Sequence, residues 1–314
     1  MSVPFTQIVG ATYDAVVNER NKAANQFAES ALLTALEKKG GIKRVPGGAK
    51  LDFTVDYRVN QGADFLATDT TATSTTKTEV LTQAQYDWAT LVVPVNWSIT
   101  DEILNSETNQ KIDLVTGIVD NAIATHDQML EEAFFAAAAT DGFLSLAVLA
   151  SSDGNGTVGS IVADTETWWA NQFNTYDISD ADIDAKLPAL FHACAKGSGS
   201  GLAPTIFTSG VTPYAQFESQ LQANQRYGQG DKGVAGFEFL KVVTADYVYS
   251  SEGGADVFAL NTKNTKLYVA NGGFRQRRSA VEMSNAAVMN MKIVSVCQIA
   301  TNNRSRMGRS NDQS

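Results

Sequence analysis

Cysteine and histidine are scarce in this chain, whose 314 residues include two of each. Cys194 and Cys297 lie far apart in unrelated sequence, so the chain offers neither a disulfide framework nor a Cys-x-x-Cys metal site. We therefore expect the protein in a reducing compartment. A zinc site lacks enough ligands, and nucleophilic catalysis would need His126 or His192 beside a serine or cysteine. His192 and Cys194 lie two apart on an expected helix and point away from each other. We expect no catalytic residue, no metal site and no cofactor.

Long apolar runs are missing as well. No uninterrupted apolar stretch approaches the roughly 20 residues that a helix needs to cross a bilayer. The N-terminal residues also lack the basic start and the apolar core of a secretory signal peptide. We therefore expect a protein that is soluble when made and that has no membrane partner.

Positive charge is limited, because the formal net charge is −10 and only 18% of the residues are charged. A strongly acidic surface repels phosphate, which disfavours tight binding of nucleic acid by the chain as a whole. Cations nevertheless cluster twice towards the C-terminus, either as a solvated turn and tail or as contacts to an acidic partner surface. The clusters comprise Arg275, Arg277 and Arg278, and then Arg304, Arg306 and Arg309.

Two long segments show the three- and four-residue apolar spacing of amphipathic helices. The first, residues 12–39, has a narrow, alanine-rich stripe that suits an arm lying along another surface. The second, residues 110–138, predicts a helix about 43 Å long that forms a spine of the fold. His126 falls on its apolar stripe, which is typical of a hydrogen-bonded core histidine, whereas the acid pair at 131–132 is expected on the helix surface.

Two strands are expected on either side of a polar segment. Residues 51–59 alternate apolar and polar side chains without a break, which predicts a strand with one buried face. Residues 86–100 alternate too, but Tyr86 and Trp88 have the opposite parity to the residues after them, which indicates a bulge or a bend. Pro94 places this second strand at a sheet edge or at a bend.

Threonine fills the segment between these strands. Residues 68–80 contain seven threonines and one serine, without proline or glycine. Such β-branched residues favour a strand but bury little. The 26 residues at 60–85 are either a flexible linker or the outer part of a long hairpin. A hairpin arm of about 20 residues would reach about 65 Å, whereas a compact chain of this size has a radius of gyration of about 20 Å, so such an arm rests on another subunit or extends into solvent.

The rest of the chain mixes helices and strands. Residues 182–196 and 211–224 predict helices, and residues 204–209 predict a strand. From residue 236 onward, short strands separated by glycine-rich turns dominate. With no repeat of fixed period, this order of elements predicts an α+β fold.

A glycine-rich motif, GNGTVG at residues 154–159, matches the dinucleotide-binding pattern G-x-G-x-x-G. That pattern binds pyrophosphate only where a strand precedes it and a helix begins at it. The residues after Gly159 do not begin a helix, so a turn between strands is the simpler interpretation. A nucleotide-binding α/β enzyme that uses GNGTVG remains as the alternative from a different class of function.

The last quarter of the chain carries a resemblance to a known family. A Gly-Phe-x-x-Leu-Lys strand is followed by a Leu-Asn-Thr-x-x-x-x-Leu strand and by a final strand that ends in an arginine-containing segment. In this order the chain resembles the major capsid proteins of tailed bacteriophages, which share the Hong Kong 97-type fold. The matching residues are Gly236-Phe237, Leu240-Lys241, Leu260-Asn261-Thr262, Leu267 and Asn303-Arg304, and Ser305 departs from the family pattern by interrupting the arginines.

The resemblance extends in order over nearly the whole chain and implies a Hong Kong 97-like capsid fold. Its parts are an N-terminal arm, an extended β-hairpin loop, a long spine helix, and peripheral and axial domains. The implied ranges are 1–49 for the arm, 50–97 for the extended loop, 98–175 for the peripheral domain with the spine helix, 176–274 for the axial domain, and 275–314 for return strands of the peripheral domain and a C-terminal tail.

The resemblance also implies a function that is structural and not enzymatic. Copies of the chain would join into hexamers and pentamers of an icosahedral phage head that encloses double-stranded DNA without sequence-specific binding. A separate scaffolding protein, a portal protein and decoration proteins are the other implied partners. The protein would be assembled in the host cytoplasm and located in the virion. An encapsulin-like compartment shell uses the same fold and is the nearest alternative.

The extended loop of this family lies across an adjacent subunit, which would explain the threonine-rich segment as a two-sided strand without an aggregation-prone face. Some members crosslink a loop lysine to an asparagine, a role for which Lys77 is the only lysine near the loop tip. Reversing Arg304 and Arg306 is expected to weaken shells more than the fold. The residues expected at contacts between subunits are Thr70, Thr73, Thr75, Lys77, Arg275, Arg277, Arg278, Arg304 and Arg306.

Overall fold

The computed structural model of the chain confirms a mixed α+β fold. It describes residues 30–58, 79–104, 114–177, 182–195, 201–223, 240–284 and 286–313. Several expectations lie outside these described residues. They are the arm before residue 30, the tip of the extended loop with Thr70, Thr73, Thr75 and Lys77, and the Gly236-Phe237 part of the capsid-like motif.

The first sheet is built around one long strand, β15, which runs from Val288 to Thr301. One edge of β15 pairs antiparallel with β4 along the whole length from Val288–Ser98 to Cys297–Ala89. The other edge pairs in turn with three shorter strands, and β1 extends the sheet beyond β12 in parallel. The partner strands are β4 (Ala89–Ser98), β12 (Thr265–Ala270), β13 (Gln276–Arg277), β14 (Val281–Glu282) and β1 (Ile42–Val45).

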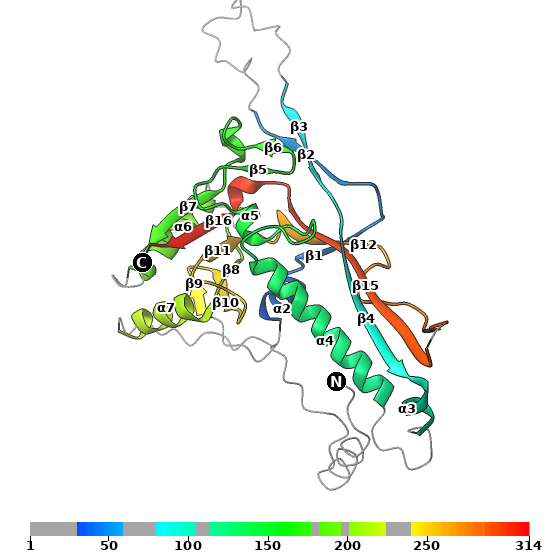
Figure 1. Cartoon of the computed structure of the whole chain (residues 1–314). Coiled ribbons are helices and arrows are strands. Elements are labelled where there is room, and N and C mark those ends of the chain that lie inside the picture. The colour runs from blue at the N-terminus through cyan, green and yellow to red at the C-terminus, as the bar shows by residue number, and fades with distance from the viewer. Residues whose placement is uncertain are drawn as a thin grey trace, which may run out of the picture.

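The spine helix α4, Leu114–Phe135, runs alongside the β4–β15 pair (Figure 1). Its 22 described residues span about 33 Å and end at Phe135, three residues before the expected end, whereas residues 110–113 of the expected helix lie outside the described residues. Alternate residues of the two strands point to the same face, so Val93 and Ile293 pack against Val119 and Ala122 of the helix. This small apolar cluster fixes the helix along the sheet. The short α3, Ile99–Leu104, follows β4.

The second sheet has the order β7-β16-β11-β8-β10-β9, and its central strands are buried on both faces. Helices α6 and α7 pack on one face, where their core includes Leu187, Phe217 and Tyr247. Residues of the other face, such as Phe258 and Leu260, join the larger core that the sheet shares with α2, α4 and the first sheet. The strands are β7 (Gln172–Tyr176), β8 (Ile206–Ser209), β9 (Leu240–Val242), β10 (Ala245–Tyr249), β11 (Val257–Leu260) and β16 (Gly308–Asp312); the helices are α2 (Ala31–Lys38), α6 (Ile183–Ala195) and α7 (Val211–Ala223).

The C-terminal segment is not a solvated tail. After β15 the chain forms a short 3-10 turn, Arg304–Arg306, and then enters the second sheet as β16. β16 lies between β7 and β11, pairing in parallel with the first and antiparallel with the second. Likewise β12, which lies within the range expected for the axial domain, pairs with β15 in the first sheet. The chain therefore passes between the two sheets twice in this region, from β11 to β12 and from β15 to β16.

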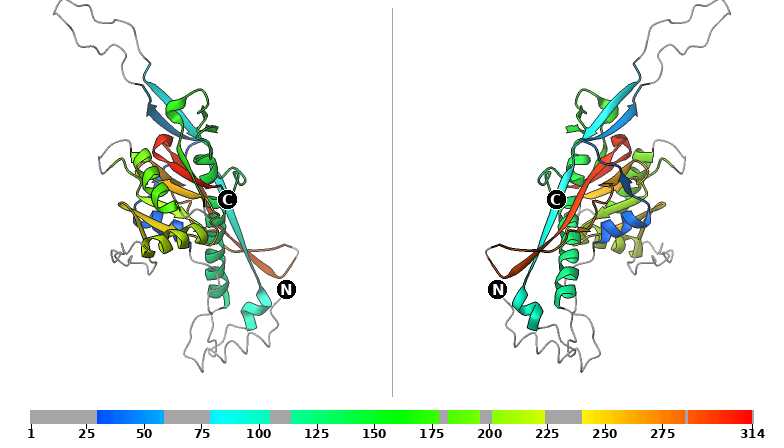
Figure 2. Two further views of the ribbon diagram at one scale, coloured as in Figure 1. Left: turned by 90° about the vertical axis from the view of Figure 1, so that its left-hand side faces the viewer. Right: turned by 90° about the vertical axis from the view of Figure 1, so that its right-hand side faces the viewer.

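The stem of the expected extended loop leaves the body of the molecule (Figures 1 and 2). It consists of β2, Leu51–Asp56, paired antiparallel with β3, Leu81–Tyr86. Tyr86 at the base is buried, whereas Leu81 at the outer end is 61% exposed. Val55, near the outer end, is nevertheless buried, and the Tyr57 ring beyond it lies 5.0 Å from the Trp168 ring, so the stem keeps contacts with its own chain while Leu81 is left exposed.

The expected bend and the expected strand edge are both confirmed. β3 ends at Tyr86 and β4 begins at Ala89 in a different sheet, which accounts for the change of parity around Trp88. Pro94 lies within β4, and in the described part of the chain β4 pairs only with β15, so its other edge needs no donor at Pro94.

Substitutions at two adjacent glycines can test how closely the backbone packs at one end of the second sheet. A Cβ at Gly253 would lie 2.6 Å from backbone atoms of Ser209, whereas a Cβ at Gly254 would meet nothing within 4 Å. Gly253→Ala should therefore lower the free energy of unfolding by about 2 kcal/mol or more because backbone must shift. Gly254→Ala is the matched control and should change it by less than about 0.5 kcal/mol. Urea denaturation of both variants measures this, and equal stabilities would contradict the packing described here.

Candidate functional site

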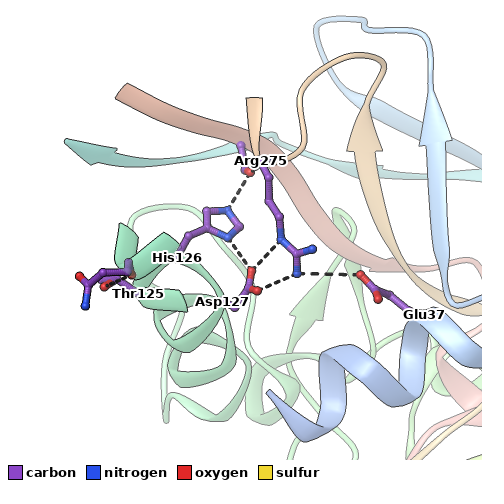
Figure 3. A network of polar contacts seen from close by, with 7 residues as sticks. Glu37, Thr125, His126, Asp127 and Arg275 are labelled. Carbon is purple, nitrogen blue, oxygen red and sulfur yellow. Dashed lines mark hydrogen bonds and ion pairs between the residues drawn. The ribbon is translucent and has the colours of Figure 1, made fainter. Parts of the chain in front are cut away.

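A polar network connects the spine helix to the first sheet (Figure 3). The guanidinium of Arg275, in the segment between β12 and β13, donates two hydrogen bonds of 2.8 Å to the two carboxylate oxygens of Asp127 on α4. Glu37 of α2 lies 4.0 Å from the same guanidinium. Two-point pairing of this kind fixes orientation as well as distance. The two bonds to Asp127 therefore fix α4 relative to the segment that leads from β12 into β13, and the longer contact with Glu37 reaches α2.

His126 extends this network into the core. Its Nδ1 lies 2.9 Å from Asp127 Oδ1, and its Nε2 lies 2.7 Å from Ser295 Oγ on β15. The Ser295 hydroxyl also accepts a hydrogen bond from the Arg275 backbone N–H. A neutral histidine with its proton on Nδ1 satisfies every one of these contacts, because the Ser295 O–H then donates to Nε2. The expectation of a hydrogen-bonded core histidine is confirmed.

The order Asp127–His126–Ser295 has the connectivity of a Ser-His-Asp triad, which we did not anticipate from the sequence. In such triads the serine Oγ must reach a substrate carbonyl. Here His126 and Ser295 are both 0% exposed, and the Oγ already accepts from the Arg275 backbone. In this arrangement Ser295 is a buried connector between α4 and β15 and is not placed to attack a substrate.

The three arginines expected at subunit contacts in the segment after β12 have different environments. Arg275 has a positive φ of 49° and uses its side chain within the chain, in the network with Asp127. Arg277 and Arg278 are exposed, and neither takes part in an ion pair between described residues. A single chain does not test contacts between subunits, but it leaves only the last two side chains open to a partner.

Arg304 is fully buried and holds a loop of its own chain. Its guanidinium donates to the carbonyl oxygens of Leu149, Asn155 and Gly156 and to the hydroxyl of Ser151, over 2.6 to 3.3 Å. Burial lowers the pKa of Arg304, and nearby acidic residues oppose that shift. Because the side chain is surrounded by its own chain, we revise the expectation that its reversal would affect assembly more than folding.

Arg306 is half-buried beside Arg304. Its guanidinium donates to the carbonyl oxygens of Cys194 and Ala195, at the C-terminal end of α6. A cation at this end of a helix is favoured by the partial negative charge of the last carbonyl groups. Arg306 therefore has a role within its own chain as well.

The glycine-rich motif at 154–159 is the loop that Arg304 holds. Gly154, Gly156 and Gly159 all have positive φ, and the motif leads into a small hairpin of β5 (Thr157–Val158) and β6 (Ile161–Val162). The carbonyl oxygens of this loop face a guanidinium, and a helix does not begin at the third glycine. The structural context that pyrophosphate binding requires is therefore missing, and the expected turn between strands is confirmed.

Glu131 corrects the expectation that both acids of its pair are surface charges. It is 2% exposed and accepts hydrogen bonds from the backbone N–H groups of Leu32 and Leu33, in the first turn of α2. Ser30, which precedes α2, makes no side-chain capping bond, so Glu131 of α4 supplies the cap in its place. Burial raises the pKa of Glu131 above its usual range, and these hydrogen bonds oppose part of the rise.

Within the ranges that the structure describes, no group of three or more histidine, cysteine or acidic residues is placed to hold a metal ion. Among those residues, no helix is long and apolar enough to span a membrane. His192 is exposed while Cys194 is buried, which confirms that they do not face each other.

We predict that Arg304 supports folding and that Arg278 does not. Arg304→Met leaves several buried carbonyl oxygens without a donor, so it should lower the free energy of unfolding by about 3 kcal/mol or more. Arg278→Met changes an exposed side chain and should alter stability by less than about 0.5 kcal/mol. Thermal and urea denaturation of the two variants under conditions that keep them dissociated provide the measurement. Similar losses in both would show that the buried position of Arg304 is wrong.

We also predict a pH dependence that belongs to Glu131. The folded carboxyl keeps its proton at pH values where the unfolded group, with an ordinary pKa of 4.5, has lost it. Stabilisation from this group is therefore complete below the unfolded pKa and declines as the pH rises through the folded pKa. Glu131→Gln removes the titration, so the stability advantage of the wild type over this variant should shrink as the pH rises above the unfolded pKa of 4.5. Urea denaturation measures it, with Glu132→Gln as the exposed control; an advantage that grows with pH would contradict the shift.

Comparison with solved structures identifies the fold. A chain of the cyanophage A-1(L) capsid asymmetric unit aligns with a TM-score of 0.66 and 15% identity over 93% of this chain and 95% of that chain. The capsid chain of the native GTA particle aligns with a TM-score of 0.59 and 11% identity over 93% of each chain. A chain of the holo-SrpI encapsulin complex from Synechococcus elongatus aligns with a TM-score of 0.56 and 10% identity over 95% of this chain and 94% of that chain.

No protein-family model and no curated protein matches the sequence. At these sequence identities the structural alignments establish only the fold. They cover nearly all of each chain, so the likeness is to whole subunits and not to a shared motif. The resemblance to major capsid proteins of tailed phages that the sequence shows is confirmed at this level, and the chain has the fold of phage capsid subunits.

Proposed function

We propose that the chain is the major capsid protein of a tailed phage, a structural subunit that assembles with copies of itself. In this proposal hexamers and pentamers close into an icosahedral head around double-stranded DNA. The alignment of whole subunits with capsid chains from a cyanophage and from the GTA particle is the observation that carries the proposal. The body then corresponds to the Hong Kong 97-type organisation, with α4 as the spine helix and the β2–β3 stem as the base of the extended loop.

The stem supports this proposal independently of the alignments. Tyr86 at its base is buried, and Leu81 at its outer end is 61% exposed. An apolar side chain that is exposed at the outer end of a two-stranded ribbon gains stability when another surface covers it. A neighbouring subunit supplies that surface in a shell. The segment at 59–78, which contains most of the threonine-rich stretch, then continues onto the neighbour. There Thr70, Thr73, Thr75 and Lys77 make the contacts, and Lys77 is the candidate for a covalent crosslink.

Further partners follow from a phage head. A scaffolding protein guides assembly, a portal protein occupies one vertex and decoration proteins bind the outer surface. The acidic chain, with a formal net charge of −10, encloses DNA without binding it tightly or sequence-specifically. Assembly takes place in the host cytoplasm.

A second candidate is an encapsulin-like compartment shell, because an encapsulin chain aligns over 95% of this chain. Both candidates predict a closed shell of one repeated subunit, and they differ in what the shell contains. Shells purified from the native source would hold DNA in the first case and a protein cargo in the second. The alternative of a nucleotide-binding enzyme is no longer supported, because the glycine motif forms a turn whose carbonyl oxygens bind the Arg304 guanidinium.

The test changes the extended loop without touching the described body. Replacing residues 59–78 with a two-residue Asn-Gly turn closes β2 and β3 directly, since that turn matches the twist of a two-stranded hairpin. We expect a folded monomer whose melting temperature is close to that of the wild type and whose yield of closed particles falls at least about tenfold. Negative-stain electron microscopy and sedimentation velocity measure both species. As a control, a scrambled 59–78 segment of the same composition separates the loss of specific contacts from a change of length. Normal particle yield from the Asn-Gly variant would refute the role of the loop.

A further inference from the structure

Charge is strongly separated along this chain. Residues 112–185 contain 13 aspartates and glutamates and no lysine or arginine. Residues 257–311 contain nine lysines and arginines and a single acid, Glu282. A chain with a formal net charge of −10 thus carries one long segment without cations and one that is almost free of anions. The question is whether these opposite charges neutralise each other inside one subunit.

Only part of the separated charge is paired inside the subunit. Arg275 pairs with Asp127, Arg309 pairs with Asp256, and Arg304 is buried among the carbonyl groups of its loop. Two exposed arginines near the far end of β15, Arg277 and Arg278, take part in none of the ion pairs between described residues. The internal pairing therefore leaves a positive surface on the subunit.

This positive surface, which we name the basic end, includes exposed apolar side chains. It consists of Arg277 and Arg278 with Val281 and Met283, which are 65% and 43% exposed. β13 and β14 pair only with β15 among the described strands, and in Figure 2 they project from the body on one side. Large exposed apolar side chains beside unpaired cations are typical of a protein-binding surface.

A negative surface of the same make-up lies around the β5–β6 hairpin, and we name it the acidic end. Its charges are Asp153, Asp164 and Glu166, which are all exposed and absent from the ion pairs between described residues. Its apolar side chains are Val162 and Phe173, which are 38% and 52% exposed. A Cβ at Gly154 would lie 3.3 Å from the Phe173 ring, so this aromatic side chain belongs to the same surface.

The two ends cannot meet within one subunit. β5 and β6 lie near the base of the β2–β3 stem, whereas β13 and β14 branch from the opposite half of β15, and the views in Figures 1 and 2 agree on this separation. A contact between two different surfaces of identical subunits is heterologous, and repeating it produces rings or lattices. Opposite charge with apolar residues on both sides is the complementarity that such a contact requires.

We infer that the basic end of one subunit binds the acidic end of the next copy. This inference deepens the proposed shell function, on which it rests, by naming a pair of surfaces that contact each other. The occupant of the basic end is a second copy and not nucleic acid, since phosphate gains nothing from Val281 and Met283 and the net charge of the chain repels it. The same contact gives the acidic end a partner, namely the basic end of another copy, whereas DNA would be repelled there.

Charge reversal at each end provides the test. Arg277→Glu/Arg278→Glu makes the basic end acidic, and Asp164→Lys/Glu166→Lys makes the acidic end basic. Each variant alone brings like charges together, so the Kd of self-association should rise at least about tenfold. The variant with all four substitutions restores opposite charges and should recover association. An equimolar mixture of the two double variants should also associate, because each end then meets its complement on the other variant.

Sedimentation velocity of the full-length proteins measures association, in about 0.05 M and in about 0.5 M NaCl, since salt screens exposed charges. Lys186→Glu/Lys241→Glu is the matched control, because it changes the net charge by the same −4 as the double arginine reversal, at positions on the second-sheet side of the molecule. It should associate like the wild type. Circular dichroism and melting temperature confirm that each variant folds.

The outcomes separate the inference from the proposed function. Recovery in the four-substitution variant or in the mixture supports the inference, whether or not closed particles form. Wild-type association that neither double reversal weakens overturns it and leaves the proposed shell function standing. Weak association of all variants, wild type included, at low salt also overturns it. If Arg277→Glu/Arg278→Glu leaves association unchanged but abolishes binding of a 30-base-pair DNA duplex, the basic end is a nucleic-acid surface and the inference is wrong.

Discussion

The pairing of β15 with its neighbours is the interaction on which the rest of the structure depends. Along one edge it holds β4, and along the other it holds β12, β13 and β14. Ser295 of the same strand anchors α4 through His126, and the chain beyond Thr301 places Arg304 in the loop at 149–156 before it enters the second sheet. One strand, with the chain that follows it, therefore positions the spine helix, the two sheets and the base of the stem, where Tyr86 donates to the Thr301 carbonyl oxygen.

The buried polar groups stabilise the fold of the subunit, whereas the exposed charged groups are the ones proposed to act in assembly. Glu131, His126 and Arg304 are buried and have partners within the chain, so removing any of them leaves unsatisfied groups in the core. The exposed charges at the basic end and at the acidic end have no ion-pair partner among the described residues, and changing them costs the fold little. Under the proposed shell function, we therefore expect a subunit that folds before it associates and whose association depends on salt and on charge complementarity.

Elements with a regular local pattern could be predicted from the sequence, whereas contacts between distant segments could not. Pro94 and the parity change around Trp88 indicated an edge strand and a bend, and the stripe on α4 indicated a core histidine at 126. The buried roles of Glu131 and Arg304 were missed because their partners lie about 100 and 150 residues away and leave no periodic signal. Local sequence around Arg304 resembles an ordinary basic tail, and only the loop at 149–156 reveals what it does.

Electron cryomicroscopy of the particles formed by the full-length chain is the decisive measurement for the proposed shell. We predict closed icosahedral particles in which each stem leads onto an adjacent subunit and each β13–β14 segment lies against β5–β6 of a neighbour. A chain that forms only a monomer or a small closed oligomer, both alone and with a scaffolding protein from its native source, would contradict the shell function. Closed particles in which the stem points into solvent would contradict the role assigned to the extended loop.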